Sequence, residues 1–220
     1  MTAADTTPAV APPRGYAKGR ARRDAIIATA SGHFAEKGFQ SATILEIAAA
    51  CGISRAGLLH YFPDKEALLQ AVLAARDDED RGRFDPYVRA AGAVGVLRGM
   101  VDLAEHNRLV PGLIALFVRL SCEAATPGHP AREYFLRRYE RIRRDTQRAL
   151  AGAARAGHVR TDLDPGAASI RLTALMDGLQ AQWLLDPGLD MAAHIGATIR
   201  EWLTPEGLRV FEGIPVLGEA

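Results

Sequence analysis

The sequence predicts an all-α protein of about nine helices. Three features of its 220 residues support this: alanine and glycine are frequent, runs of β-branched residues are rare, and apolar residues recur at helical spacing. A chain of this length can bury a substantial core as one or two domains. We therefore expect packed helix faces to supply the core.

The composition excludes several classes of protein. The formal net charge is only +1, so the charge of the whole chain indicates no partner. The two cysteines, Cys51 and Cys122, lie far apart without metal-ligand spacing, which excludes a disulfide-rich secreted domain. The N-terminus has no apolar segment typical of a signal peptide, and no window has about 18 uninterrupted apolar residues. We expect a cytoplasmic protein without a membrane span.

The N-terminal segment is predicted to precede the first helix as a tail. Residues 1–19 are rich in alanine, threonine and proline before they turn basic, so we expect a disordered basic tail there. The first helix is predicted for residues 20–37, where apolar residues form one stripe. The members of this stripe are Ile26, Ile27, Ala30 and Phe34. Gly38 is expected to end the helix in a left-handed conformation.

Two short helices with clear start signals follow. Thr43 can cap the second helix, and Glu46 stands three residues later, as in a capping box. Gly52 ends this helix. Ser54 can cap a third helix that runs to about Phe62.

The fourth helix is predicted for residues 64–85. Pro63 stops the helix before it, and Asp64 can cap the new one. Its charged run at residues 76–81 is expected to be solvated surface, because charged residues are rarely buried. The domain boundary is placed at Asp85–Pro86.

Five more helical segments are expected beyond this boundary. Prolines stand at or near three of their starts, where a missing N–H costs least. The segments are 89–107, 111–125, 130–156, 165–185 and 191–203. The last 15 or so residues remain ambiguous.

The second and third helices have the features of a tight corner. Such a corner needs a small residue where the helices cross, a glycine in the turn and apolar anchors under the projecting helix. Ala48 and Gly52 meet the first two needs. Ile53, Leu58 and Tyr61 can serve as the anchors. This set predicts a helix-turn-helix whose second helix enters the DNA major groove. The alternative is a generic helical corner with a solvated face.

Basic residues are concentrated around this corner. Residues 14–62 contain seven basic and three acidic side chains, a net charge of +4 in a chain of +1. Arg55 can hydrogen-bond guanine or neutralise a phosphate. Arg20, Arg22 and Arg23 would belong to a basic arm suited to phosphates or a minor groove. The alternative for this arm is a solvated disordered tail.

A longer pattern around the corner resembles a known family. Its residues are Arg23, Ile26-Ile27, Ala30, Phe34-Ala35-Glu36-Lys37-Gly38-Phe39, Ala42-Thr43-Ile44, Ile47-Ala48, Gly52-Ile53-Ser54, Leu58, Tyr61-Phe62, Lys65-Glu66 and Leu68-Leu69. Over residues 20–73 this pattern resembles the tetracycline-repressor (TetR) family of bacterial transcriptional regulators. The resemblance implies a homodimer that binds a palindromic DNA operator, as a repressor that a small-molecule inducer releases.

The resemblance also implies a division of the chain. After the tail of residues 1–19, residues 20–63 would form a three-helix DNA-binding domain with the helix-turn-helix. Residues 64–85 would form a connecting helix, and residues 86–220 a larger helical domain for ligand binding and dimerisation.

The positions that contact DNA are carried over from the family. Phosphate contacts map to Thr43, Tyr61 and Lys65. Base-facing positions map to Ser54, Arg55, Ala56, Gly57 and His60. Leu59 stands where many members carry a tyrosine, so the polar contact there is either missing or replaced by an apolar one.

Two apolar helix faces near the C-terminus are candidates for the dimer interface. Residues 172–190 are similar to the penultimate-helix region of many family members, where it pairs with the last helix in a dimer interface. The proposed contact residues are Leu172, Leu175, Leu179, Trp183, Ile195, Ile199 and Trp202. Large apolar faces of this kind are either interface or core, and core packing within one chain is the alternative.

A ligand site is expected between helices of the C-terminal part. The candidates combine apolar walls with a few polar or soft groups: Met100, Leu103, His106, Phe117, Cys122, Tyr134, Arg138, Met176 and Gln180. The alternative for each is ordinary core packing or, for His106, a surface position. The chemistry of the inducer does not follow from these residues.

Arginines are dense after Pro130. A solvated face is the simplest interpretation of the stripe they form: Arg137, Arg141, Arg144, Arg148 and Arg155. The alternative is an anion-binding surface or a wall of a pocket for an acidic effector. Arg138 and Arg143 lie off the stripe and are expected to point inward or toward a partner.

The sequence contains no constellation typical of an enzyme. It has no phosphate-binding glycine loop, no nucleophile elbow and no histidine pair at metal-binding spacing, so we expect no catalytic residues, no metal and no cofactor. The competing hypothesis is a helical protein that binds small molecules without functional DNA recognition.

Overall fold

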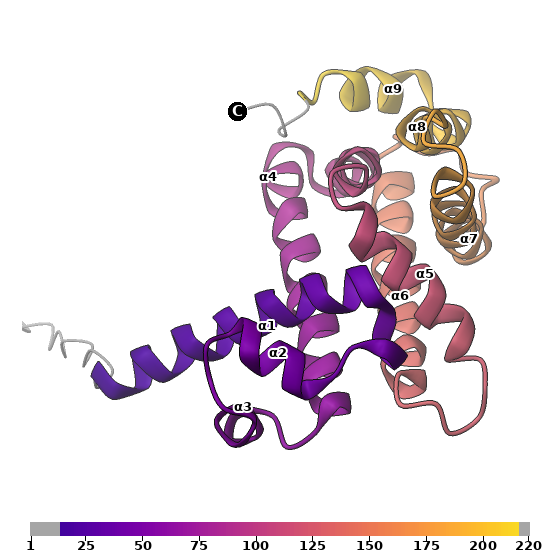
Figure 1. Cartoon of the computed structure of the whole chain (residues 1–220). Helices are drawn as coiled ribbons and strands as arrows, with labels where there is room; N and C mark the ends of the chain where they lie inside the picture. The colour runs from indigo at the N-terminus through magenta and orange to yellow at the C-terminus, as the bar shows by residue number, and fades with distance from the viewer. Residues whose placement is uncertain (1–13, 216–220) are drawn as a thin grey trace, which may run out of the picture.

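The computed structural model describes residues 14–215, with side chains from Lys18 onward. Within that range the chain forms nine α-helices (Figure 1): α1 Arg14–Ser41, α2 Ile44–Ala50, α3 Arg55–Tyr61, α4 Lys65–Asn107, α5 Pro111–Glu123, α6 Arg132–Arg155, α7 Pro165–Trp183, α8 Met191–Trp202 and α9 Pro205–Glu212. The predicted all-α fold is confirmed. None of the helices in this range has both the length and the hydropathy needed to cross a membrane.

The first helix begins earlier than predicted. Residues 14–19 are already helical, so the prediction of a disordered tail is wrong for them, and residues 1–13 lie outside the described residues. The predicted break at Gly38 is present, with φ 77°, although helical structure resumes beyond it to Ser41. The basic residues of the expected arm therefore extend from a helix, which projects past α3 in Figure 1.

The fourth helix is one long element instead of two. Pro86 lies inside α4, so the break predicted at Asp85–Pro86 is wrong. The break lies at Ala91 and Gly92, where Gly92 has φ 51°. A Cβ at Gly95 would lie 1.9 Å from the carbonyl oxygen of Tyr87. The two halves of α4 can therefore fold against each other only because glycine leaves this space empty.

The last helix was not predicted. Thr204 caps α9 by accepting a hydrogen bond from the backbone N–H of Gly207 at 3.1 Å. Phe211 of α9 is fully buried, beneath the guanidinium groups of Arg98 and Arg200. The number of helices in the described range is still nine, because two predicted helices form the single helix α4 and the unpredicted helix α9 is added.

The chain has two hydrophobic cores, and the first crosses the predicted domain boundary. This core joins α1, α2, α3 and the start of α4 to Leu116, Phe117, Leu120, Tyr134 and Phe135 from α5 and α6. The second core is formed by the rest of α4, the C-terminal half of α6, and α7, α8 and α9. Figure 1 shows α1–α3 at one end, α8 and α9 at the other, and α4 running between them. The corner helices α2 and α3 are thus connected to α5 through α1, which packs on α5.

Candidate functional site

The corner between α2 and α3 has the predicted geometry. Gly52 adopts φ 64°, a left-handed conformation that glycine adopts without steric cost. The backbone N–H groups of Gly52 and Ile53 donate to the carbonyl oxygens of Ala49 and Ala48, both at 3.0 Å. Ala48 and Leu58 are buried in the first core. The structure therefore fixes α3 at the surface by one glycine turn and one buried leucine.

α3 presents a short polar face to solvent. Ser54, Arg55, Ala56 and His60 are exposed, while Gly57, Leu59 and Tyr61 are half-buried. The Ser54 hydroxyl caps the helix by accepting the backbone N–H of Gly57 at 3.0 Å. Arg55 is the only arginine or lysine in α3. Small side chains around one guanidinium let the helix backbone come close to base edges in a groove.

Thr43, a predicted phosphate contact, is already occupied by helix capping. Its hydroxyl accepts the backbone N–H of Glu46 at 3.2 Å, and its own N–H donates to the Glu46 carboxylate at 3.0 Å. Lys37 donates to the same carboxylate at 2.7 Å and, with Thr43, lowers the pKa of Glu46 to about 2. The predicted capping box is confirmed, and Thr43 can donate to a phosphate only if this box opens.

Lys65 was also predicted to contact phosphate, but the structure uses its ammonium group elsewhere. Lys65 Nζ donates to the carbonyl oxygens of Phe39 at 2.9 Å, Gln40 at 3.1 Å and Ala42 at 3.1 Å. An ammonium group has three donors, so all are engaged. Lys65 therefore ties the start of α4 to the end of α1 and leaves no donor for DNA.

The three arginines of the expected arm have different environments. Arg22 donates to the carbonyl oxygen of Cys51 at 2.9 Å and so binds the C-terminal end of α2. The guanidinium of Arg23 lies 4.9 Å from the ring centre of Phe62. Arg20 is exposed and makes no hydrogen bond or ion pair within the described part of the chain. Of the three, Arg20 is the most available to a phosphate.

A shallow groove adds one basic residue that the predicted DNA contacts missed. It lies between the N-terminal half of α1 and the end of α3, and it is lined by Lys18, Gly19, Arg22 and Tyr61. Within the described range the hydroxyl of Tyr61 has no hydrogen-bond partner, while its ring meets that of His60 edge-on. Tyr61 and Lys18 therefore line the same groove.

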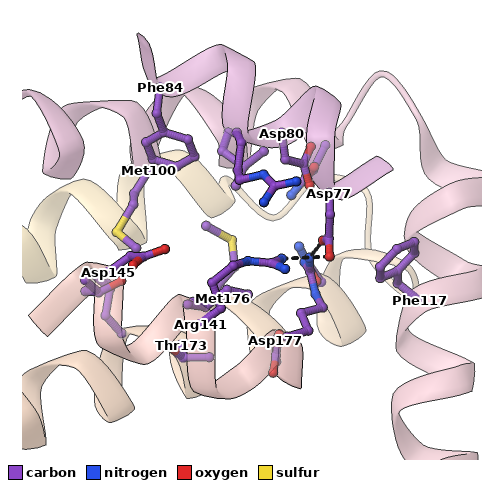
Figure 2. Close-up of a pocket in the computed structure, with 18 of the residues that line it drawn as sticks. Asp77, Asp80, Phe84, Met100, Phe117, Arg141, Asp145, Thr173, Met176 and Asp177 are labelled. Atoms are coloured by element: carbon purple, nitrogen blue, oxygen red, sulfur yellow. Dashed lines mark hydrogen bonds and ion pairs between the residues drawn. The ribbon is translucent and has the colours of Figure 1, made fainter. Parts of the chain in front are cut away.

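A second candidate site is a cavity of about 280 Å³ between α4, α5, α6 and α7. Apolar and charged residues both line it: Phe84 and Met100 lie on one side with Asp145, and Asp77 and Asp80 lie on the other with Phe117 beyond them (Figure 2). The apolar residues are Phe84, Val96, Met100, Leu103, Ile114, Phe117, Ile142, Leu172 and Met176. The polar ones are Arg76, Asp77, Asp80, Arg81, Asn107, Arg138, Arg141, Asp145, Thr146, Thr173, Asp177 and Gln180.

Ion pairs across the cavity connect α4 to α6. Asp77 of α4 accepts hydrogen bonds from Arg138 and, at 2.7 Å, from Arg141, both on α6. Arg76 forms an ion pair with Asp80 at 3.0 Å and donates to Asn107 at 2.8 Å. Burial of this charged wall raises the pKa of Asp80 to about 6 and lowers that of Arg138 to about 10.

The predicted solvated run at residues 76–81 is therefore wrong for three of its members. Arg76, Asp77 and Asp80 are buried, because they continue the face of α4 on which Leu69 and Leu73 are buried. Helical spacing from those leucines was a signal that could have placed the three charged residues inward.

Six of the nine predicted ligand residues line this cavity: Met100, Leu103, Phe117, Arg138, Met176 and Gln180. The other three do not. Cys122 is exposed, and Tyr134 is buried with its hydroxyl donating to the carbonyl oxygen of Leu73 at 3.1 Å. His106 lies outside the lining, 3.4 Å from a guanidinium nitrogen of Arg76, and burial lowers its pKa.

Some of the arginines that follow Pro130 lie at the cavity and the others are exposed. Arg138 points inward, whereas Arg143 is exposed, so of its two predicted orientations only the one toward a partner remains. Arg141 belongs to the cavity wall and not to a solvated face. The remaining members, Arg137, Arg144, Arg148 and Arg155, are exposed.

The residues predicted for the dimer interface mostly pack inside the chain. Six of them are buried in the second core: Leu172, Leu179, Trp183, Ile195, Ile199 and Trp202. Helices of their own chain cover them, which favours the alternative of core packing for these six residues. Leu175 is half-buried and remains a candidate.

Both parts of the chain match described families. Residues 26–72 match "Bacterial regulatory proteins, tetR family", and residues 114–205 match "BetI-type transcriptional repressor, C-terminal". The chain is 31% identical to the HTH-type transcriptional repressor AcnR of Corynebacterium efficiens, over 71% of this chain and 78% of that one. It is 30% identical to an HTH-type transcriptional repressor of Mycobacterium tuberculosis, over 74% and 82%.

A solved structure shares the fold. A transcriptional regulator from Saccharomonospora viridis, in complex with choline, superposes with a TM-score of 0.72 at 24% identity, over 84% of this chain and 98% of that one. The corner geometry, the two family matches and the repressors that align over most of both chains lead to one conclusion. The chain belongs to the tetracycline-repressor (TetR) family of bacterial transcriptional regulators.

Proposed function

We propose that the protein is a repressor that binds a palindromic operator in the cytoplasm as a homodimer and is released by a small molecule in the cavity. The observation that carries the proposal is α4. This helix contributes to the cavity wall through Asp77, and at its start Lys65 ties it to the end of α1, just before α2. A ligand that shifts α4 would therefore shift the segment that leads into the corner.

The small-molecule part of the proposal rests on the cavity and on a structural neighbour. The Saccharomonospora viridis regulator was solved with choline, which supports a ligand between the helices of this fold. A ligand that binds better to dimers with misplaced recognition helices would lower operator affinity, and operator DNA would lower ligand affinity by the same factor.

The competing hypothesis is a helical protein that binds small molecules without functional DNA recognition. The exposed guanidinium on α3 and the basic groove beside Tyr61 favour DNA binding. The two hypotheses differ in one measurable property, which is preference for operator DNA over random DNA. A protein without DNA recognition would bind both equally.

Replacing Arg55 with alanine tests the recognition role of α3. If Arg55 contacts a base, the preference for operator over random DNA should fall by about 1–3 kcal/mol. Fluorescence anisotropy with DNA from upstream of the protein's own gene would measure both affinities at fixed salt, because phosphate contacts make each affinity salt-dependent.

The matched control is Arg89→Ala, which removes an exposed arginine outside the corner. It should leave both affinities unchanged. An equal loss on operator and random DNA in the Arg55 variant would instead assign Arg55 to a phosphate.

We propose that the homodimer forms through the outward faces of α7 and α8. On α7 the exposed or half-buried residues Ile170, Ala174, Gly178 and Ala181 share one side at helical spacing, and Leu185 follows just after the helix ends. Ile170 is 55% exposed and Leu185 is 89% exposed. Small residues between them let a second helix approach closely, and exposed apolar faces of this kind mark contact sites.

Ala174→Glu should separate the dimer without unfolding the chain. Two unpaired carboxylates would be buried at the two-fold interface, which should raise the dimer dissociation constant roughly a hundredfold. Sedimentation velocity across a concentration series would measure this. Ala74→Glu, at an exposed position of α4, is the control, and an unchanged dimer in the Ala174 variant would exclude this face.

A further inference from the structure

At one end of the cavity two guanidinium groups meet at one carboxylate. Both oxygens of Asp77 are engaged, one by Arg138 and the other by Arg141. The other two arginines of the lining have carboxylates of their own, since Arg76 pairs with Asp80 and Arg81 with Asp78. Two arginines therefore share a single carboxylate.

The lining has two further carboxyl groups, and neither is at ion-pair distance from Arg138 or Arg141 within the described chain. Asp177 accepts a hydrogen bond from the hydroxyl of Tyr139 at 2.7 Å. Asp145 is exposed and lies beside Arg144 and Arg148.

Arg138 and Arg141 keep free hydrogen-bond donors at this end. A guanidinium has five N–H donors. Only Nη1 of Arg138 and Nη2 of Arg141 make hydrogen bonds within the described part of the chain. Arg138 is also held in place over the ring of Phe117, 5.1 Å from its centre. Planar guanidinium groups of this kind match the geometry of carboxylates and phosphates.

The rest of the cavity is suited to an apolar group. Phe84 and Met100 lie on the side away from Asp77, and Met176 lies between, as Figure 2 shows. Leu172 and Ile142 complete this wall. The cavity thus has one end where two arginines share a carboxylate and a largely apolar body, and its volume of about 280 Å³ is at the lower limit for small-molecule sites.

We propose that the ligand of this cavity is a small amphipathic organic anion, whose carboxylate binds Arg138 and Arg141 while its apolar body lies against Phe84, Met100 and Met176. The role of this anion as the effector rests on the function proposed above. The ligand carboxylate competes with Asp77 for the two arginines, so binding weakens the link between α4 and α6.

Calorimetry on the full chain with three eight-carbon probes tests the charge of the ligand. The probes are octanoate, octanamide and octyltrimethylammonium, which share an alkyl chain and differ in head group. Octanoate should bind at least about tenfold more tightly than octanamide, because two guanidinium groups bind only the charged head. Equal affinity for octanoate and octanamide, or preference for the cation, would overturn the proposal.

Variants then locate the head group. Arg141→Met removes the guanidinium group and leaves an unbranched apolar side chain in its place. It should weaken octanoate binding about tenfold, with little effect on octanamide. Arg137→Met, at an exposed position of the same helix, should change neither affinity. Loss of both probes in the Arg141 variant would indicate damage to the cavity and contradict the assignment.

Asp77→Asn should have the opposite effect. It removes the competing carboxylate, so octanoate should bind several-fold more tightly than to the unmodified protein. Structural damage would not raise the affinity of the variant for octanoate. Weaker octanoate binding to the variant would show that the ligand carboxylate does not compete with Asp77 for the two arginines. Operator binding without any probe tests the proposed function separately, so a regulator that binds DNA but prefers octanamide would fail only the proposal of an anion.

Discussion

Replacing Asp77 with alanine is expected to lower the free energy of unfolding by about 3–5 kcal/mol, as is usual when one partner of a buried ion pair is removed. Asp77 is 3% exposed and accepts hydrogen bonds from Arg138 and Arg141. Without it, the buried guanidinium of Arg138 loses its ion-pair partner. The link between α4 and α6 is lost at the same time, so the two helices should also separate more readily.

Urea denaturation followed by circular dichroism would measure this change, with Asp78→Ala as the control. Asp78 is adjacent in sequence and also bonds an arginine, Arg81, but both side chains are exposed, so its loss should cost less than about 1 kcal/mol. Equal effects of the two substitutions would show that the buried position of Asp77 has no energetic consequence.

The second large effect is expected at Leu58. This residue is fully buried and is the only buried side chain of α3, a helix of seven residues. Leu58→Ala should cost about 2–5 kcal/mol of stability, because it removes apolar contacts and leaves a cavity under a helix too short to persist alone. Operator affinity should fall along with stability, since α3 loses its anchor.

Thermal denaturation and operator titration on the same samples would separate the two effects. Leu45→Ala, at a position of α2 that is 64% exposed, serves as the control and should change stability little. If operator binding by the Leu58 variant survives at temperatures where the variant remains folded, the position of α3 does not depend on this contact.

The sequence by itself determined the local structure of the corner. Thr43, Ser54 and Asp64 cap the helices that they were predicted to cap, and Gly52 makes the left-handed turn. These features were predictable because each depends on groups within a few residues of one another. A side-chain oxygen and a backbone N–H three residues apart meet whatever the rest of the chain does.

The cavity was only partly predictable from the sequence. Apolar candidates such as Met100 and Met176 were identified because apolar side chains in the C-terminal part must pack between helices. Asp77 was missed as a cavity residue and a cavity wall was only the alternative for Arg141, since a charged residue is normally assigned to the surface unless a partner is known. The two arginines that pair with Asp77 lie 61 and 64 residues further along the chain, and sequence patterns do not pair residues over such distances.

Only the tertiary structure decided which faces of the helices point inward. α7 carries apolar residues on both sides, so periodicity could not distinguish Leu172 and Leu179, which are buried, from Ile170, which is exposed. The continuity of α4 through Pro86 was likewise set by packing of its two halves. Burial depends on what covers a face, and the covering helices come from distant parts of the sequence, whereas caps and turns depend only on their neighbours.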